Sequence, residues 1–170
     1  MTESEQRKIF QEWLSSYKGL LFKIVRAYAF TPDDQDDLFQ EISIQVWHSI
    51  PKFRYESAVS TWLYRISLNV AFKWTKKHRR HQENHQPLEN MHHVLEEANE
   101  PVDERLAWLY EQIASFNEID RSLTLMLLDG FSYKEMSNIL GITLSNVGVK
   151  INRIKKSLIT KSENYDYHGV

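Results

Sequence analysis

Carboxylate and amide side chains cluster in the segment DDQDDLFQE, Asp33 to Glu41. An Asp-Asp-x-x-Asp arrangement can bind Mg²⁺ and, through it, a diphosphate, because this cation prefers oxygen ligands. An isoprenoid-chain enzyme of that type needs a second Asp-rich cluster facing the first across a large apolar cavity. The remaining sequence supplies no such cluster, so we do not expect this chemistry.

A helix start explains part of the acidic segment. Thr31 is a suitable N-cap, Pro32 suits the first helical position, and Asp33 and Asp34 lie near the positive end of the helix dipole. The acidic and amide residues beyond the first turn need another explanation. They lie along one side of the helix: Asp37, Gln40, Glu41, Gln45 and, with them, His48. Such a face repels DNA, so we expect it to meet a basic protein partner.

Positive charge is concentrated in a different segment. Ser60 to Arg80 holds six Lys or Arg and no Asp or Glu, although the chain has a formal net charge of -2. Arg65, Asn69, Lys73, Lys76 and Arg80 follow helical steps of three and four, so they form a stripe that can follow a phosphate backbone. A solvated charged face is the simpler alternative. The missing acids count against it, because exposed helices gain from pairs of opposite charge.

Aromatic residues accompany this stripe. Phe53, Tyr55, Trp62 and Tyr64 lie just before it or in its first turns. Unpaired bases stack on such rings, with roughly 1–3 kcal/mol per base. The combination predicts binding to single-stranded or locally opened nucleic acid.

The C-terminal part has a second basic segment, with no Asp or Glu from Met136 to Ser162. Ser132 and Glu135 have the spacing of a capping box, Gly141 provides a turn, and a helix follows from about Thr143. This layout is typical of a helix-turn-helix, whose second helix enters the major groove. Thr143, Ser145 and Asn146 are placed to contact base edges, and Lys150 and Arg153 to hold phosphates or a guanine.

Helical periodicity predicts the elements that carry these residues. An apolar stripe from Phe10 to Tyr28 predicts the first helix. The second helix should run from Thr31 to about Ile50, and the basic segment from Ser60 to Arg80 should form the third. The third helix should bury Leu63, Ile66, Val70 and Trp74. Four more helices follow from Asp103. We therefore expect an all-α fold of two small helical domains, residues 1–80 and 103–162, joined by a flexible linker over 81–102.

Composition agrees with this fold. The 170 residues are 42% hydrophobic and include five Gly, four Pro and no Cys. Glycine and proline are too few for an all-β fold with many turns, and no apolar run approaches the roughly 20 residues of a membrane span. No secretory signal precedes the first helix. We expect a cytoplasmic protein without a disulfide framework.

Three stretches, in this order, resemble a known family: DDLFQEISIQVW, KFRYESAVSTWLYRISLNVAFKW and LLDGFSYKEMSNILGITLSNVGVKINRIKKSL. They are similar to the two domains of bacterial extracytoplasmic-function sigma factors of the sigma-70 superfamily, which act with RNA polymerase. The resemblance covers nearly the whole chain apart from the linker and the tail. The run Ser60 to Ile66, followed by Asn69, is its most specific part.

The resemblance implies a role for each surface. Asp37, Gln40 and Glu41 would dock on the clamp helices of the largest polymerase subunit. The N-terminal domain would bind the minus-ten promoter element, where a non-template base leaves the stack, and the helix-turn-helix would bind the minus-thirty-five element as duplex. Together with the basic stripe, the expected minus-ten contacts are Phe53, Arg54, Tyr55, Thr61, Trp62, Arg65, Asn69, Lys73 and Lys76. The family also implies an anti-sigma partner, often membrane-anchored, that covers these faces.

Two features depart from the family pattern. Gly148 stands inside the second helix of the helix-turn-helix, where members often have a basic residue, and glycine lowers helix stability by about 1 kcal/mol. The linker is rich in histidine, at positions 78, 81, 85, 92 and 93. These spacings fit no usual metal-ligand set, so a solvated linker is the better interpretation.

Two other functions remain as alternatives at this point. A stand-alone helix-turn-helix transcriptional regulator would use its N-terminal domain for dimerisation or ligand sensing, but such a domain does not need the basic segment. An all-α enzyme is not expected, since the chain has no HExxH, glycine-rich phosphate loop or Ser-His-Asp arrangement. We expect no cofactor and no metal site.

Overall fold

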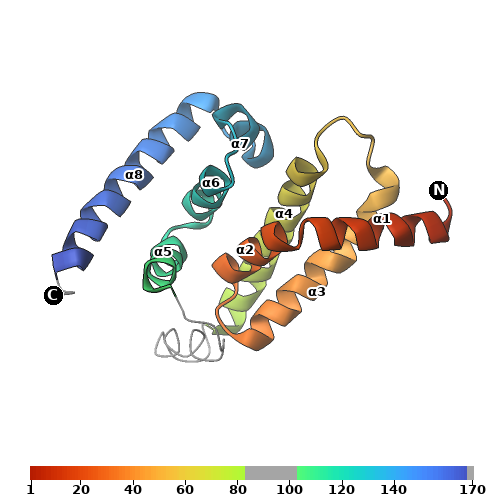
Figure 1. Cartoon of the computed structure of the whole chain (residues 1–170), viewed down its shortest axis with the longest axis horizontal. Coiled ribbons are helices and arrows are strands. Elements are labelled where there is room, and N and C mark those ends of the chain that lie inside the picture. Colours follow the sequence, from red (N-terminus) through yellow and green to blue (C-terminus); the bar gives the residue numbers. More distant parts are fainter. Residues whose placement is uncertain (83–102, 168–170) are drawn as a thin grey trace. The chain divides into compact units, whose positions relative to one another are not determined.

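The computed structural model of the 170-residue chain describes residues 1–82 and 103–167 (Figure 1). These residues form α-helices and one short 3-10 helix, with no strand among them, which confirms the expected all-α fold. The chain divides into two compact units, Met1–Ala107 and Trp108–Val170. The expected linker lies almost wholly outside the described residues, so the domain limits based on it stay predictions. No helix in the described ranges is long and apolar enough to span a membrane.

The predicted first helix is in fact two helices, α1 (Glu3–Ser16) and α2 (Lys18–Tyr28). They meet at Tyr17, whose backbone leaves helical geometry with φ -110° and ψ 16°. Serines 15 and 16 and glycine 19 have low helix propensity, so a bend here costs little. The apolar spacing continues across the bend, and for this reason spacing alone predicted one helix.

The start of α3 (Pro32–Ser49) is as predicted. The Thr31 hydroxyl accepts a hydrogen bond from the backbone N–H of Asp34 at 3.1 Å, and Pro32 occupies the first turn. The buried residues of α3 are Leu38, Ile42 and Val46. A 3-10 helix (Ile50–Lys52) then leads into the loop before α4 (Val59–Gln82).

Helix α4 buries more of its surface than predicted. Leu63, Val70 and Trp74 are buried as expected, while Ile66 is only half-buried. Burial extends to a neighbouring row of side chains: Tyr64, Ser67, Leu68 and Ala71. The reason is that α4 packs against both α2 and α3, and two neighbours cover a wider arc of a helix than one.

The N-terminal unit is a bundle in which α2, α3 and α4 pack against one another (Figure 1). Helix α1 lies against α2, α3 and the 3-10 helix. Its Gln6 side chain donates a hydrogen bond to the backbone carbonyl of Trp47 at 2.7 Å, and the Phe10 and Trp47 rings meet edge to face at 5.4 Å. These contacts fix α1 across the C-terminal end of α3.

The C-terminal unit contains α5 (Glu104–Ser115) from Trp108 onward, α6 (Glu118–Leu128), α7 (Tyr133–Leu140) and α8 (Leu144–Tyr167). Helices α6, α7 and α8 pack on one another. The second half of α8 reaches α5, where the Trp108 and Tyr165 rings lie 5.6 Å apart and the Lys161 ammonium lies 5.4 Å from the Phe116 ring. Apolar spacing on α8 predicts a buried stripe of Val147, Ile151, Ile154 and Leu158; the first three are buried and Leu158 is half-buried.

The helix-turn-helix layout is confirmed by its caps. Ser132 and Glu135 form the predicted capping box at the start of α7, with hydrogen bonds of 2.7 and 3.2 Å. Gly141 ends α7 in the left-handed conformation, with φ +67°, which glycine adopts without the steric penalty of a Cβ atom. The turn therefore directs the chain from α7 straight into α8.

Candidate nucleic-acid interface

Three aromatic rings form a cluster at the base of the loop between the 3-10 helix and α4. Trp13 of α1 meets Phe53 and Trp62 edge to face, with ring centroids 5.2 and 5.4 Å apart. The Phe53 and Trp62 rings lie 4.9 Å from each other. Trp13 is only 7% exposed, so it supports the two half-buried rings from beneath. Trp13 belongs to the apolar stripe that predicts the first helix, and only the fold shows that it also supports these two rings.

Tyr55 occupies the tip of this loop in an unusual conformation. Its φ of +57° lies in the left-handed region, which L residues other than glycine seldom adopt. The side chain is 72% exposed, and its ring lies 4.7 Å from the ring of Phe53. The loop thus places a ring in solvent on top of the aromatic cluster. Strained backbone of this kind is found disproportionately at functional sites.

Tyr64 must be removed from the predicted stacking residues. Its side chain is 0% exposed, because it belongs to the additional buried row of α4. A ring without an accessible face cannot stack on a base. The prediction failed because helical spacing alone did not show that α4 has two packing partners.

The basic stripe of α4 is accessible. Arg65, Asn69, Lys73 and Lys76 are exposed, and Thr61 at the start of the helix is half-buried. None of the three cations forms an ion pair with a described residue. The side chain of Arg80 lies outside the described set. Exposed cations without protein counter-charges are available to neutralise phosphates and release their counterions.

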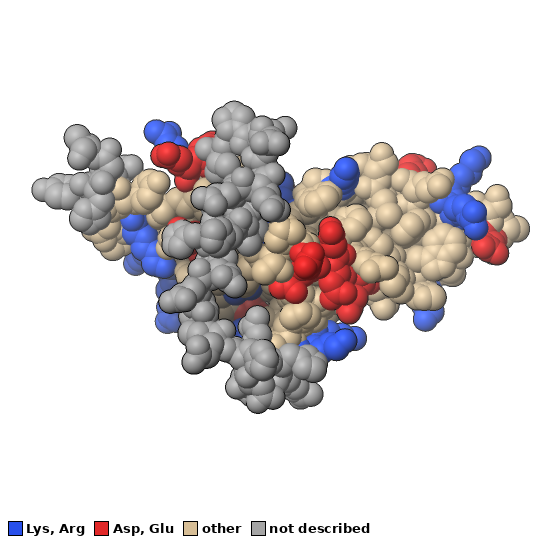
Figure 2. Space-filling model, turned by 90° about the horizontal axis from the view of Figure 1, so that it is seen from below, with Lys and Arg blue, Asp and Glu red and all other residues tan. Residues whose placement is uncertain are grey.

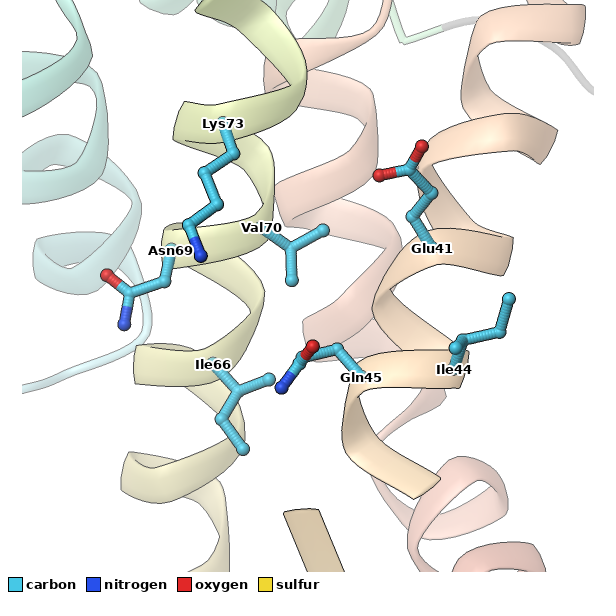
Figure 3. Close-up of a pocket in the computed structure, with 7 residues that line it drawn as sticks. All are labelled: Glu41, Ile44, Gln45, Ile66, Asn69, Val70 and Lys73. Atoms are coloured by element: carbon cyan, nitrogen blue, oxygen red, sulfur yellow. The ribbon is translucent and has the colours of Figure 1, made fainter. Parts of the chain in front are cut away.

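A groove of about 410 Å³ lies on the surface between α3 and α4 (Figure 3). Ile44, Ile66 and Val70 give it apolar lining, and polar side chains from both helices complete it. Glu41 and Gln45 come from α3, while Asn69 and Lys73 come from α4 (Figure 3). The predicted acidic docking face and the predicted DNA stripe therefore meet in one groove.

The acidic residues of α3 lie on the surface of the same unit. Asp37 and Gln40 are exposed and Glu41 is half-buried. Figure 2 shows acidic side chains gathered in a compact patch on the face that α3 contributes. One oxygen of the Asp37 carboxylate, Oδ2, accepts a hydrogen bond from the indole N–H of Trp74 at 2.8 Å. A hydrogen bond thus joins the predicted docking face of α3 to α4, the helix that carries the basic stripe.

The recognition end of the helix-turn-helix is exposed, with one exception. Thr143 caps α8, since its hydroxyl accepts a hydrogen bond from the backbone N–H of Asn146 at 3.1 Å. Ser145, Asn146 and Arg153 are exposed. Lys150 instead forms an ion pair of 3.2 Å with Asp120 of α6, with side chains 27% and 23% exposed. The contact of Lys150 with DNA stays a prediction. In such a contact the Lys150 ammonium would interact with the Asp120 carboxylate and with the DNA at the same time.

A metal centre finds no support in the described ranges. No group of three or more His, Asp or Glu there is placed to hold a metal ion. Most of the linker histidines lie outside these ranges.

Comparisons with known proteins agree with this geometry. The model of sigma-70 region 2 matches residues 13–81, which hold the aromatic cluster, the acidic face and the basic stripe. The ECF RNA polymerase sigma-E factor of Haemophilus influenzae is 28% identical over 167 residues, covering 91% of this chain and 88% of that protein. The sigma-E factor of Escherichia coli is 26% identical with similar coverage, and SigM of Mycobacterium tuberculosis is 24% identical over 159 residues.

Solved structures show the same fold. CnrH, solved in complex with the cytosolic domain of CnrY, gives a TM-score of 0.67 at 18% identity over 93% of this chain and 90% of that one. The sigma factor RpoE of Bartonella quintana, solved with the anti-sigma factor NepR, gives the same TM-score and identity over 88% and 93%.

The solved structures share the fold of this chain, and residues 13–81 match sigma-70 region 2. This match, together with the similarity to extracytoplasmic-function sigma factors along about nine tenths of the chain, supports a sigma factor of the sigma-70 family. The stand-alone regulator considered from the sequence is not favoured, because the similar proteins are sigma factors.

Proposed function

We propose that this chain binds core RNA polymerase, directs it to a specific set of promoters and helps to open the DNA there. It acts in the cytoplasm and has no catalytic activity of its own. The observation that carries the proposal is the groove of the N-terminal unit, where an acidic face of α3 and a cationic face of α4 lie side by side. One face suits a basic protein and the other suits nucleic acid, as a polymerase subunit that binds DNA requires.

Docking on polymerase is assigned to Asp37, Gln40 and Glu41. All three lie on α3, and the first two are exposed. The proposed partner surface is the pair of clamp helices in the largest subunit of the polymerase. Opposite charges across such an interface raise the association rate and fix the register of the two proteins.

Minus-ten recognition is assigned to the loop and the stripe of the N-terminal unit. The aromatic cluster supplies ring faces, Tyr55 supplies an exposed ring above it, and Arg65, Lys73 and Lys76 supply phosphate contacts. An unpaired base that leaves the duplex loses stacking energy of a few kcal/mol, and stacking on protein rings offsets that loss. The remaining residues assigned to this element are Phe53, Arg54, Thr61, Trp62 and Asn69.

Minus-thirty-five recognition is assigned to the start of α8. Thr143, Ser145 and Asn146 lie at the N-terminal end of the second helix of the helix-turn-helix, where base edges are contacted. Arg153 is a phosphate contact, and Lys150 a weaker one because it is paired with Asp120. We also propose that an anti-sigma protein regulates the chain by covering these surfaces, as solved complexes of proteins with this fold suggest.

Reconstituted transcription tests the function. The purified chain is added to core RNA polymerase and sheared genomic DNA of the source organism, and the 5′ ends of the transcripts are mapped. We expect a small set of start sites that share upstream sequences and require the chain. Transcripts no more specific than those of core polymerase alone would refute the proposal. A footprint by the free chain on a palindromic site would instead support the stand-alone regulator.

A further inference from the structure

Two polar contacts join the N-terminal part of α3 to the C-terminal part of α4. The indole N–H of Trp74 donates to Oδ2 of Asp37 at 2.8 Å. One turn further along α4, Nε2 of His78 lies 3.4 Å from Oδ1 of Asp34. Both carboxylates therefore face a ring of α4.

The Trp74 ring is held rigidly. It is 4% exposed, and the imidazole of His78 stacks on it with centroids 3.7 Å apart and planes inclined by 22°. A buried ring with a stacked neighbour has little freedom to rotate, so the direction of its N–H is fixed. Asp37, in contrast, is exposed, and an exposed aspartate without such a partner would sample several rotamers.

We propose that Trp74 is a positioning residue for polymerase binding, which holds the Asp37 carboxylate through Oδ2 and leaves Oδ1 directed toward a cation of the polymerase. This inference rests on the docking role proposed for Asp37. Fixing a side chain before association removes the entropy loss that binding would otherwise impose. Trp74 does not touch the polymerase and acts only through Asp37.

The hydrogen bond also ties the docking residue to the DNA-binding helix. Trp74 lies directly after Lys73, and Lys73 lines the same groove as Glu41. A shift of α4 would therefore move the Asp37 carboxylate with it.

A double-mutant cycle tests the proposal. Trp74→Phe keeps an aromatic ring and removes the indole N–H, and Asp37→Ala removes the acceptor. The dissociation constant for core RNA polymerase is measured with the full chain, singly and doubly substituted, at one ionic strength. We expect Trp74→Phe to weaken binding about three- to tenfold when Asp37 is present, where tenfold corresponds to about 1.4 kcal/mol, and not at all in the Asp37→Ala background.

A control distinguishes positioning from a general effect on stability. In a Glu41→Ala background, Trp74→Phe should still weaken binding by the full factor, since the indole N–H of Trp74 donates to Asp37 and not to Glu41. Equal weakening in the Asp37→Ala background would show that the ring acts through packing, and would overturn the inference. The indole N–H resonance of Trp74 gives a second measurement that needs no change to Trp74: Asp37→Ala should move it upfield in the free protein, and an unmoved resonance would also overturn the inference.

Failure of the inference and failure of the docking assignment give different results. If Asp37→Ala, Glu41→Ala and Gln40→Ala all bind polymerase like the unsubstituted chain, the docking face itself is wrong. If these changes weaken binding and Trp74→Phe does not, only the positioning role is wrong.

Discussion

The two basic helices of this protein, α4 and α8, resemble each other in sequence and differ in the surroundings of their cations. Both segments lack acidic residues over more than twenty positions. On α4, Arg65, Lys73 and Lys76 are exposed and form no ion pair with any described residue. On α8, the central Lys150 is paired with Asp120 of the neighbouring helix.

The residues that support the two helices, and those displayed beside them, also differ. The loop before α4 rests on three tryptophan and phenylalanine rings and displays a fourth ring, Tyr55, in solvent. The start of α8 displays small polar side chains instead, and aliphatic residues hold the helix in place. Rings and free cations suit strands that have parted, whereas small polar groups on a firmly seated helix suit the edges of paired bases. In the proposed function, the two units thus adapt similar charge to two forms of DNA.

The largest expected effect comes from removing the ring that supports the N-terminal loop. Trp13→Ala deletes a nearly buried ring and should lower the free energy of unfolding of the N-terminal unit by about 3–5 kcal/mol. Amide hydrogen exchange of the full chain measures this, because it reports opening of α4 and α8 separately.

Trp108→Ala is the matched control in the other unit. Trp108 is half-buried and contacts Tyr165, so its loss should destabilise only the C-terminal unit, by about 1–2 kcal/mol. Faster exchange in α8 after Trp13→Ala, equal to that in α4, would contradict the division between the units.

The contrast between free and paired cations predicts opposite consequences on α8. Arg153→Ala should leave stability unchanged and lower the slope of log affinity against log salt by about one for minus-thirty-five duplex. Lys150→Ala should change the slope less and destabilise the unit by about 1 kcal/mol, because it removes the counter-charge of the half-buried Asp120, which keeps the hydrogen bond from the Asn117 side chain. Salt titrations and denaturant unfolding check both. Equal slope changes for the two variants would show that Lys150 binds DNA despite its pairing.

The smallest effect concerns the glycine in the second helix of the helix-turn-helix. A Cβ atom at Gly148 would meet nothing within 4 Å, so Gly148→Ala should stabilise the C-terminal unit by about 1 kcal/mol through helix propensity. Gly141 also has open space, but its φ of +67° should make Gly141→Ala destabilising by a similar amount. Thermal unfolding compares the two. If both substitutions raised the stability of the unit, the open space around the Cβ atom rather than the backbone conformation would determine the outcome.

Features set by neighbouring residues were predictable from the sequence. The cap of α3 at Thr31, the capping box of Ser132 and Glu135, and the left-handed Gly141 depend on residues within one helical turn. The core faces of α3 and α8 follow from spacing along a single helix. The exposure of Arg65, Asn69 and Lys73 also follows, because the spacing places them on another face of the helix than the apolar stripe.

Features set by distant residues were not predictable. The hydrogen bond from Trp74 to Asp37 joins residues 37 positions apart, and the Lys150–Asp120 pair spans 30. Tyr64 is buried because a second helix covers its side of α4. Each of these depends on which helices become neighbours, and a single sequence does not state that.

Promoter opening by the Arg65→Ala variant tests the central claim most directly. Transcription with core polymerase is compared on one promoter in two forms, fully paired and pre-melted around the minus-ten element, with Lys8→Ala on α1 as a control for loss of charge. If the exposed face of α4 holds parted strands during opening, Arg65→Ala will reduce transcription strongly on the paired promoter and much less on the melted one, while Lys8→Ala will affect neither. An equal reduction by Arg65→Ala on both forms would contradict the account.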